Sequence, residues 1–92
     1  MAGVRLIIQF TAENSAEADK QVEAMADRCR NAQSEPGCLQ FEVFRSALRP
    51  ETYALLEHWT SEQALEEHRK RGVAGSGANV TRVREHYEHQ PA

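Results

Sequence analysis

His68 is the residue of this chain best suited to acid–base chemistry. It follows Ala64 and Leu65 at helical spacing, so these three side chains are expected to form the inner face of one helix. An imidazole is either neutral or protonated near pH 7, and a buried neutral ring could take the proton of a phenolic hydroxyl group. The alternative is a structural histidine that packs at a helix end and hydrogen-bonds to the backbone. We take His68 as the candidate catalytic residue.

Trp59 and Tyr53, which share one predicted strand, could contact a substrate. The indole of Trp59 could stack on a planar molecule. The competing explanation is a core residue that joins the strand to the next helix or fills a dimer interface. The Tyr53 hydroxyl could also reach a substrate, although packing at the edge of the sheet is enough to explain this residue.

Glu57 lies on the same side of this strand as Trp59, because side chains alternate along a strand. A buried carboxylate is normally matched by a hydrogen bond or a cation. We therefore expect Glu57 either to orient a group in a pocket or to pair with Arg82 or Arg84. The candidate substrate-binding residues are Trp59, Glu57, Tyr53 and Arg84.

The remaining histidines and the glycines do not match a metal or cofactor site. No two histidines have the spacing of a helical zinc site, and His86 and His89 are expected at the surface. The glycines of residues 72–77 are in the wrong order for a phosphate-binding loop, so this segment is predicted to be a flexible connector. We expect neither a metal nor an organic cofactor.

Composition limits the kinds of partner. The 92 residues are enough for one domain, which we assign to residues 1–92, and the net charge of -3 argues against nucleic acid. No apolar run is long enough to span a membrane, and residues 1–10 have the pattern of a strand rather than of a signal peptide. Cys29 and Cys38 are expected to be reduced thiols in the cytoplasm.

Apolar periodicity predicts the first half of the chain as strand, helix and strand. Residues 4–10 alternate as a strand, and Asn14 with Glu17 fits a capping box at the start of a helix. That helix should end before Pro36. The strand that follows places Leu39, Phe41 and Val43 on one face.

The second half is predicted as strand, helix and strand. A turn over residues 47–51 leads to the strand that ends at Trp59, and a helix starts at Thr60 or Ser61, where Thr60 with Gln63 fits a capping box. Residues 80–89 give the last strand. The complete order is that of a ferredoxin-like α+β fold, with a four-stranded antiparallel sheet and both helices on one face.

The sheet is predicted to have apolar residues on both faces. Two helices can cover only one of these faces, so a second copy packed sheet against sheet is the simplest cover for the other. A chain this short also buries a small core of its own, which oligomerisation would enlarge. We therefore expect a homodimer.

Three motifs are similar to those of the antibiotic biosynthesis monooxygenase family. They are Glu35-Pro36-Gly37-Cys38, Glu57-x-Trp59 and Ala64-Leu65-Glu66-x-His68, and the resemblance extends from Val4 to His89. It implies a dimeric α+β barrel with a pocket between sheet and helices. Members studied as enzymes oxygenate electron-rich aromatic molecules, such as quinols and hydroxylated polyketides, with molecular oxygen and without metal or flavin.

The chain departs from this family after the second helix. Members usually continue through a Pro-His-Phe-like segment into a short helix that roofs the pocket, whereas here the glycine-rich residues 72–77 follow. The roof is therefore expected to be short or absent, and a role in haem degradation fits poorly. The sequence favours a cofactor-independent monooxygenase. The alternatives are a non-catalytic dimeric domain that binds a ligand or a protein, and a related isomerase or cyclase.

Overall fold

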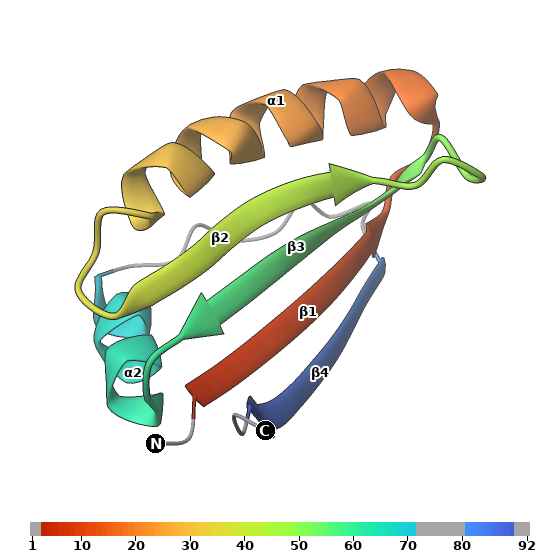
Figure 1. Ribbon diagram of the computed structural model, residues 1–92. Coiled ribbons are helices and arrows are strands. Elements are labelled where there is room, and N and C mark those ends of the chain that lie inside the picture. The colour runs from red at the N-terminus through yellow and green to blue at the C-terminus, as the bar shows by residue number, and fades with distance from the viewer. Residues whose placement is uncertain (1–2, 72–80, 90–92) are drawn as a thin grey trace.

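The computed structural model describes residues 3–71 and the backbone of residues 81–89, and Figure 1 shows the arrangement of its elements. These elements are β1 (Gly3–Thr11), α1 (Ser15–Ala32), β2 (Cys38–Arg45), β3 (Thr52–Trp59), α2 (Glu62–Lys70) and β4 (Thr81–His89). Their order is the one predicted. The predicted connector at 72–77 lies outside the described residues.

The strands form one antiparallel sheet in the order β2-β3-β1-β4. The central strand β1 pairs with β3 from Val4 opposite Trp59 to Thr11 opposite Thr52. On its other side β1 pairs with β4 along its whole length. Two helices and one antiparallel sheet in this chain order make the ferredoxin-like α+β fold that the sequence predicted.

Both helices contribute to a single buried core on one face of the sheet. In Figure 1, α1 runs along β2, and α2 lies at the end of the sheet where β3 finishes. Alternate residues of the strands meet residues of both helices, because successive side chains of a strand point to opposite faces. The core includes Val4, Leu6 and Phe10 of β1, Phe41 of β2, Tyr53, Leu55 and Trp59 of β3, Ala18, Cys29 and Ala32 of α1, and Leu65 of α2.

The helix α1 begins and ends as predicted. The side chain of Asn14 accepts a hydrogen bond of 2.8 Å from the backbone N–H of Glu17, which satisfies one of the free donors of the first turn. The last helical residue is Ala32, ahead of Pro36. The apolar side of α1 therefore stops just before the connection that leads into β2.

The capping box predicted for α2 at Thr60 is wrong by one residue. Ser61 is the cap, and its side chain accepts a hydrogen bond of 3.1 Å from the N–H of Ala64. The reason lies outside the helix. The N–H of Thr60 donates to the carbonyl oxygen of Gly37 at 2.8 Å, so Thr60 is bound to the α1–β2 connection and the helix begins after Ser61.

The predicted position of Leu39 is also wrong. Leu39 was expected to share a face with Phe41 and Val43, but it is 57% exposed, whereas Phe41 is buried. The pairing of β2 with β3 shifts between Cys38 and Gln40, so Leu39 is the extra residue of a β-bulge. The bulge interrupts the strict alternation on which the prediction depended.

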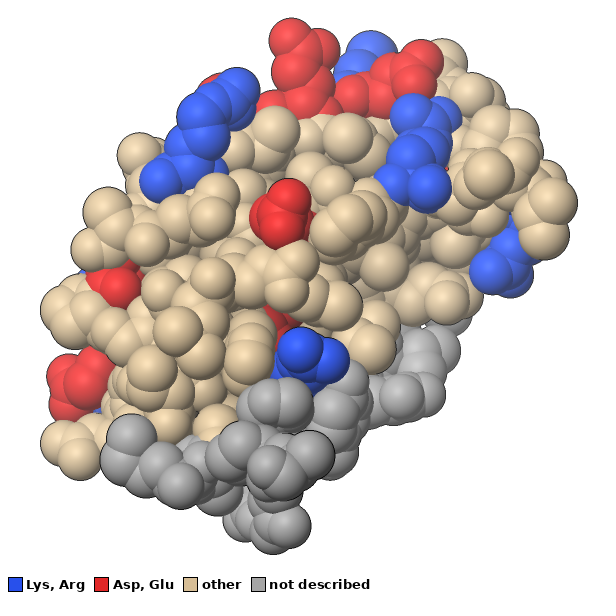
Figure 2. All heavy atoms as spheres, viewed as in Figure 1, with Lys and Arg blue, Asp and Glu red and all other residues tan. Residues whose placement is uncertain are grey.

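Neither α1 nor α2 packs against the other side of the sheet, which we call the open face. Its described residues include Arg5, Ile7 and Gln9 of β1, Gln40, Glu42 and Phe44 of β2, and Ala54, Leu56 and His58 of β3. Ile7 and Leu56 pair in register and stay partly exposed, and Phe44 is 48% exposed. Figure 2 shows most of the charged groups over α1 and at the ends of the sheet, with isolated acidic and basic groups on the otherwise uncharged surface over the strands.

Candidate active site

The close approach of the α1–β2 connection to α2 depends on Gly37. Its backbone φ is +83°, in the left-handed region that favours glycine. A Cβ atom at this position would lie 2.6 Å from the Cβ of Ala64 and 2.9 Å from the Oγ1 of Thr60. Only a residue without a side chain fits there, and the tight turn carries the neighbouring Glu35 to the end of α2.

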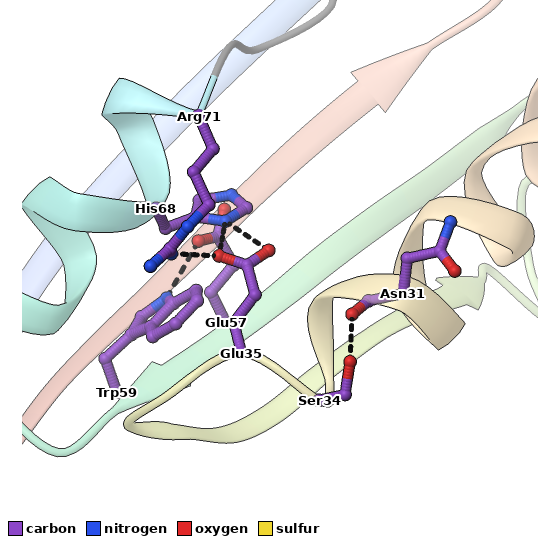
Figure 3. Close-up of polar contacts among 7 residues, drawn as sticks. All are labelled: Asn31, Ser34, Glu35, Glu57, Trp59, His68 and Arg71. Carbon is purple, nitrogen blue, oxygen red and sulfur yellow. Dashed lines mark hydrogen bonds and ion pairs between the residues drawn. The ribbon is translucent and has the colours of Figure 1, made fainter.

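At that end of α2, the carboxylate of Glu35 contacts both His68 and Arg71 (Figure 3). The Nδ1 atom of His68 lies 3.0 Å and 3.1 Å from the two carboxylate oxygens of Glu35. Arg71 donates to Oε1 of the same carboxylate at 2.6 Å. The side chains of His68 and Glu35 are only 17% and 20% exposed. This contact joins two segments that are 33 positions apart.

Two aromatic rings border the imidazole of His68. The Trp59 ring centroid lies 4.9 Å from that of His68, with the planes inclined by 36°, and the Phe41 centroid lies 5.2 Å away, inclined by 59°. Trp59 and Phe41 themselves meet edge to face at 6.2 Å. Both rings belong to the buried core, with Trp59 0% and Phe41 5% exposed, so the cluster combines an acid–base group with closely packed aromatic side chains.

Glu57 is the buried carboxylate of this cluster, only 5% exposed. It accepts a hydrogen bond of 3.0 Å from the indole Nε1 of Trp59. Burial raises the pKa of Glu57 because desolvation disfavours its charged form, while the indole hydrogen bond and the nearby His68 and Arg69 act in the opposite direction. This hydrogen bond fixes the orientation of the Trp59 indole.

The two cysteines are free thiols, and Cys38 lies near the same carboxylates. Burial, followed by the negative charges of Glu35 and Glu57, raises the pKa of Cys38 to about 11. A thiol must ionise to act as a nucleophile. The raised pKa of Cys38 leaves little thiolate at neutral pH, so this thiol is poorly suited to act as a nucleophile.

Of the residues predicted from the sequence, His68, Trp59 and Glu57 are brought together. Tyr53 is not. It lies six positions before Trp59 on β3, roughly 20 Å away by the rise of a strand, and it stacks on Phe10 with ring centroids 5.1 Å apart. The backbone of Arg84 pairs with Ile8 of β1. The side chains of Arg82 and Arg84, and with them the predicted ion pair to Glu57, lie outside the described residues.

Three residues of the cluster, Glu35, Phe41 and Arg71, were not predicted from the sequence as site residues. The available signal for Glu35 was its position next to Pro36-Gly37, a turn that must pass close to another segment. Among the side chains described for residues 3–71, no group of three His, Cys, Asp or Glu could hold a metal ion. No helix in the described part of the chain is long and apolar enough to cross a membrane.

The chain belongs to the antibiotic biosynthesis monooxygenase family, because the sequence profile of that family matches residues 3–89. No curated protein sequence matches it significantly. The membership confirms the resemblance seen in the sequence motifs.

Solved structures share this fold. A conserved Bacteroides thetaiotaomicron protein of unknown function superposes with a TM-score of 0.80 at 20% identity, covering 96% of this chain and 98% of its own. A Deinococcus radiodurans protein, named as a candidate member of the same family, gives 0.79 at 20% identity, with coverages of 97% and 94%. SnoaB from Streptomyces nogalater, a cofactor-independent oxygenase solved as a variant, gives 0.65 at 16% identity, with coverages of 98% and 95%. At these identities the similarity shows the fold alone.

Proposed function

We propose that this protein is a monooxygenase that oxidises a quinol-like or polyketide aromatic with molecular oxygen, without metal or organic cofactor. The observation that carries the proposal is the position of His68, held by Glu35 on one side and bordered by the rings of Trp59 and Phe41 on the other. Membership of the monooxygenase family and the oxygenase activity named for SnoaB support the class of reaction.

In the proposed reaction, His68 takes the proton of a phenolic hydroxyl group. The resulting phenolate is electron-rich and passes one electron to oxygen, and the two radicals combine into a peroxide at the ring carbon. The peroxide collapses to a quinone. One oxygen atom stays on the ring and the other leaves as water, so a hydroxyarene and O₂ give a quinone and H₂O without an external reductant. Trp59 is proposed to border the substrate ring, with Glu57 fixing its indole. Because Trp59 is 0% exposed, a substrate reaches it only by displacing the side chains that cover it.

Arg84 and Tyr53 are the remaining candidate residues for substrate binding. Arg84 is proposed to contact the substrate from β4, where its backbone lies beside Ile8. Tyr53 stacks on Phe10 far from His68, so any contact with a substrate would be at the other end of the sheet. We place the protein in the cytoplasm, where its two free thiols stay reduced.

We also propose that two chains pack through their open faces into a dimeric α+β barrel. Because the sheet has apolar residues on both sides and the helices cover only one, the open face needs a cover. Closed twofold dimers are the commonest assembly that provides one. The Nε atom of Arg5 on the open face is buried and has no hydrogen-bond partner within the described part of one chain. This atom is already shielded by its own chain, so the support for a dimer comes from the partly exposed apolar residues Ile7, Leu56 and Phe44 of the open face.

Oxygen uptake tests the proposed function directly. A panel of hydroquinones and hydroxynaphthalenes should support uptake by the wild type, and His68→Ala should reduce it by about 10²- to 10⁴-fold, the range of a general base. Glu66→Gln is the matched control, because Glu66 lies exposed on the same helix and pairs only with Arg69 among the contacts described. Equal uptake by wild type and His68→Ala would remove His68 from the reaction.

The same packing of His68 favours a second candidate, a dimeric domain that binds a ligand without catalysis. In that case the Glu35–His68 contact serves only to join α2 to the α1–β2 connection. Calorimetric binding of a hydroxynaphthalene without oxygen uptake would support this function. Turnover of the substrate under argon would instead indicate an isomerase or cyclase.

A further inference from the structure

We propose that Glu35 is a positioning residue, which keeps the hydrogen of His68 on Nδ1 and so leaves Nε2 as the atom that accepts the substrate proton. The tautomer itself follows from the geometry of the cluster. Its consequence for catalysis rests on the proposed function. The two parts can be tested separately.

The distances define the direction of the hydrogen bond. Nδ1 of His68 lies almost equally far from both oxygens of Glu35, at 3.0 Å and 3.1 Å, so it faces the carboxylate squarely. An ionised carboxylate can only accept hydrogen bonds. A ring nitrogen with a lone pair at this position would oppose the oxygen lone pairs. The hydrogen of a neutral His68 ring is therefore on Nδ1.

Arg71 supports this arrangement. Its guanidinium donates to Oε1 of Glu35 at 2.6 Å, and such charge-assisted bonds are the strong ones. With Arg71 and His68 both donating, the carboxylate acts as acceptor in both contacts. The positive charge of Arg71 also offsets the cost of placing Glu35 in a largely buried position.

Glu35 differs from the other acidic residues at this end of the molecule. Glu66 and Glu67 pair with Arg69 and Lys70 one helical turn away, in exposed contacts of the kind that contribute little. Glu35 reaches His68 from another segment, and the shielded position of the pair strengthens the bond between them. The turn at Gly37 makes this reach possible, so the geometry is built into the backbone.

The rings of Trp59 and Phe41 limit the alternatives open to the imidazole. They lie at different inclinations, 36° and 59°, so the His68 ring is held from two directions. A ring rotated by half a turn would exchange Nδ1 for a carbon atom and lose both contacts to Glu35. Packing and hydrogen bonding therefore select the same orientation, which is the requirement for a preorganised base.

Nitrogen NMR of the ring tests the tautomer without any substrate. In ¹⁵N-labelled protein, at a pH where imidazoles are neutral, long-range ¹H–¹⁵N correlation separates protonated from unprotonated ring nitrogens, and His68→Ala identifies the His68 signals. We expect a protonated Nδ1 and an unprotonated Nε2 in the wild type. A protonated Nε2 there would overturn the proposal outright.

Variants of Glu35 complete the test. Glu35→Ala should move His68 towards a mixture of tautomers, Glu35→Gln should keep part of the Nδ1–H preference through its amide oxygen, and the control Glu66→Gln should match the wild type. An unchanged His68 spectrum in folded Glu35→Ala would refute the role of Glu35. If Glu35→Ala does not fold, the spectra of the wild type and of Glu35→Gln still show whether the hydrogen of His68 is on Nδ1.

Kinetics test the catalytic consequence. With a substrate found in the uptake panel, Glu35→Ala should lower kcat by about 10- to 100-fold, the range known for partners that orient metal-bound histidines, with little change in KM. A loss confined to KM would contradict a role in proton transfer. If the wild type shows no uptake with any substrate, the proposed function fails, whereas the spectra still establish or refute the tautomer.

Discussion

The indole Nε1 of Trp59 donates a hydrogen bond of 3.0 Å to the carboxylate of Glu57, two positions earlier on β3. Both residues are buried, and residues two apart on a strand share a face. A bulky ring and an acidic group thus satisfy each other in the core beside His68. A substitution at either residue would therefore change the stability of the fold as well as the surroundings of His68.

The Trp59–Glu57 bond predicts a difference between two substitutions. Glu57→Gln keeps an oxygen that can accept the indole hydrogen, whereas Glu57→Leu leaves that buried N–H without its acceptor. We expect Glu57→Leu to be less stable than Glu57→Gln by about 1–3 kcal/mol. The free energies of unfolding in urea measure the difference. Equal values for the two variants would show that the hydrogen bond contributes nothing.

The raised pKa of Glu57 predicts a pH dependence of stability. Between the pKa of Glu57 in the unfolded chain and its higher value in the folded protein, the folded state binds more protons. The free energy of unfolding should therefore be highest below the unfolded pKa and fall as pH rises through the folded one. Subtracting the urea unfolding curves of Glu57→Gln from those of the wild type, from about pH 4 to pH 8, isolates this change. A flat difference would contradict it.

Gly37→Ala should destabilise the protein by at least about 1–3 kcal/mol. The substitution forces an alanine into the left-handed region and places its Cβ against Ala64. Thermal unfolding measures the loss, with the exposed Gln33→Ala as control for the same connection. The Glu35–His68 contact should weaken in parallel, because Gly37 sets the path of the turn. A stable Gly37→Ala would mean that the turn can relax.

Cys38 should react slowly with iodoacetamide in the folded protein. Its pKa of about 11 leaves far less thiolate at neutral pH than an ordinary cysteine has, so alkylation should be at least about 100-fold slower than in the urea-unfolded chain. Peptide mass spectrometry resolves Cys38 from Cys29. The rate should rise as the pH is raised towards 10. Rapid labelling at pH 7 would contradict the raised pKa.

Ile7→Glu should convert the proposed dimer into monomers. Ile7 pairs in register with Leu56 in the middle of the open face, where a carboxylate would be buried without a partner. Analytical ultracentrifugation at micromolar concentration gives the mass of each variant. Ala24→Glu, on the exposed side of α1, is the control that should remain dimeric. A monomeric wild type would exclude the sheet-to-sheet assembly.

The sequence was sufficient for the order of elements because its signals are local. Alternating apolar residues, the Asn14 cap and Pro36 each act within a few positions, and the structure follows them. The errors arose where a distant segment intervened. The cap moved to Ser61 because Gly37 binds the backbone of Thr60, and the bulge at Leu39 depends on how β2 pairs with β3.

The same distinction applies to the site. His68 faces inward by helical spacing, and Glu57 and Trp59 share a face by strand alternation, so all three could be predicted. Glu35 could not, because its contact with His68 joins residues 33 positions apart. Neither the charge of Glu35 nor its neighbours in sequence indicate which of several basic residues it would meet.

The bulge at Leu39 has a further consequence for how copies of the protein can meet. The strand that contains it, β2, is at one edge of the sheet, where unpaired backbone groups could recruit a foreign strand. An extra residue with a protruding leucine spoils the regular ladder that such strand addition requires. Edge-to-edge growth towards fibrils is thereby discouraged at the start of β2, while association through the broad side of the sheet is left unhindered.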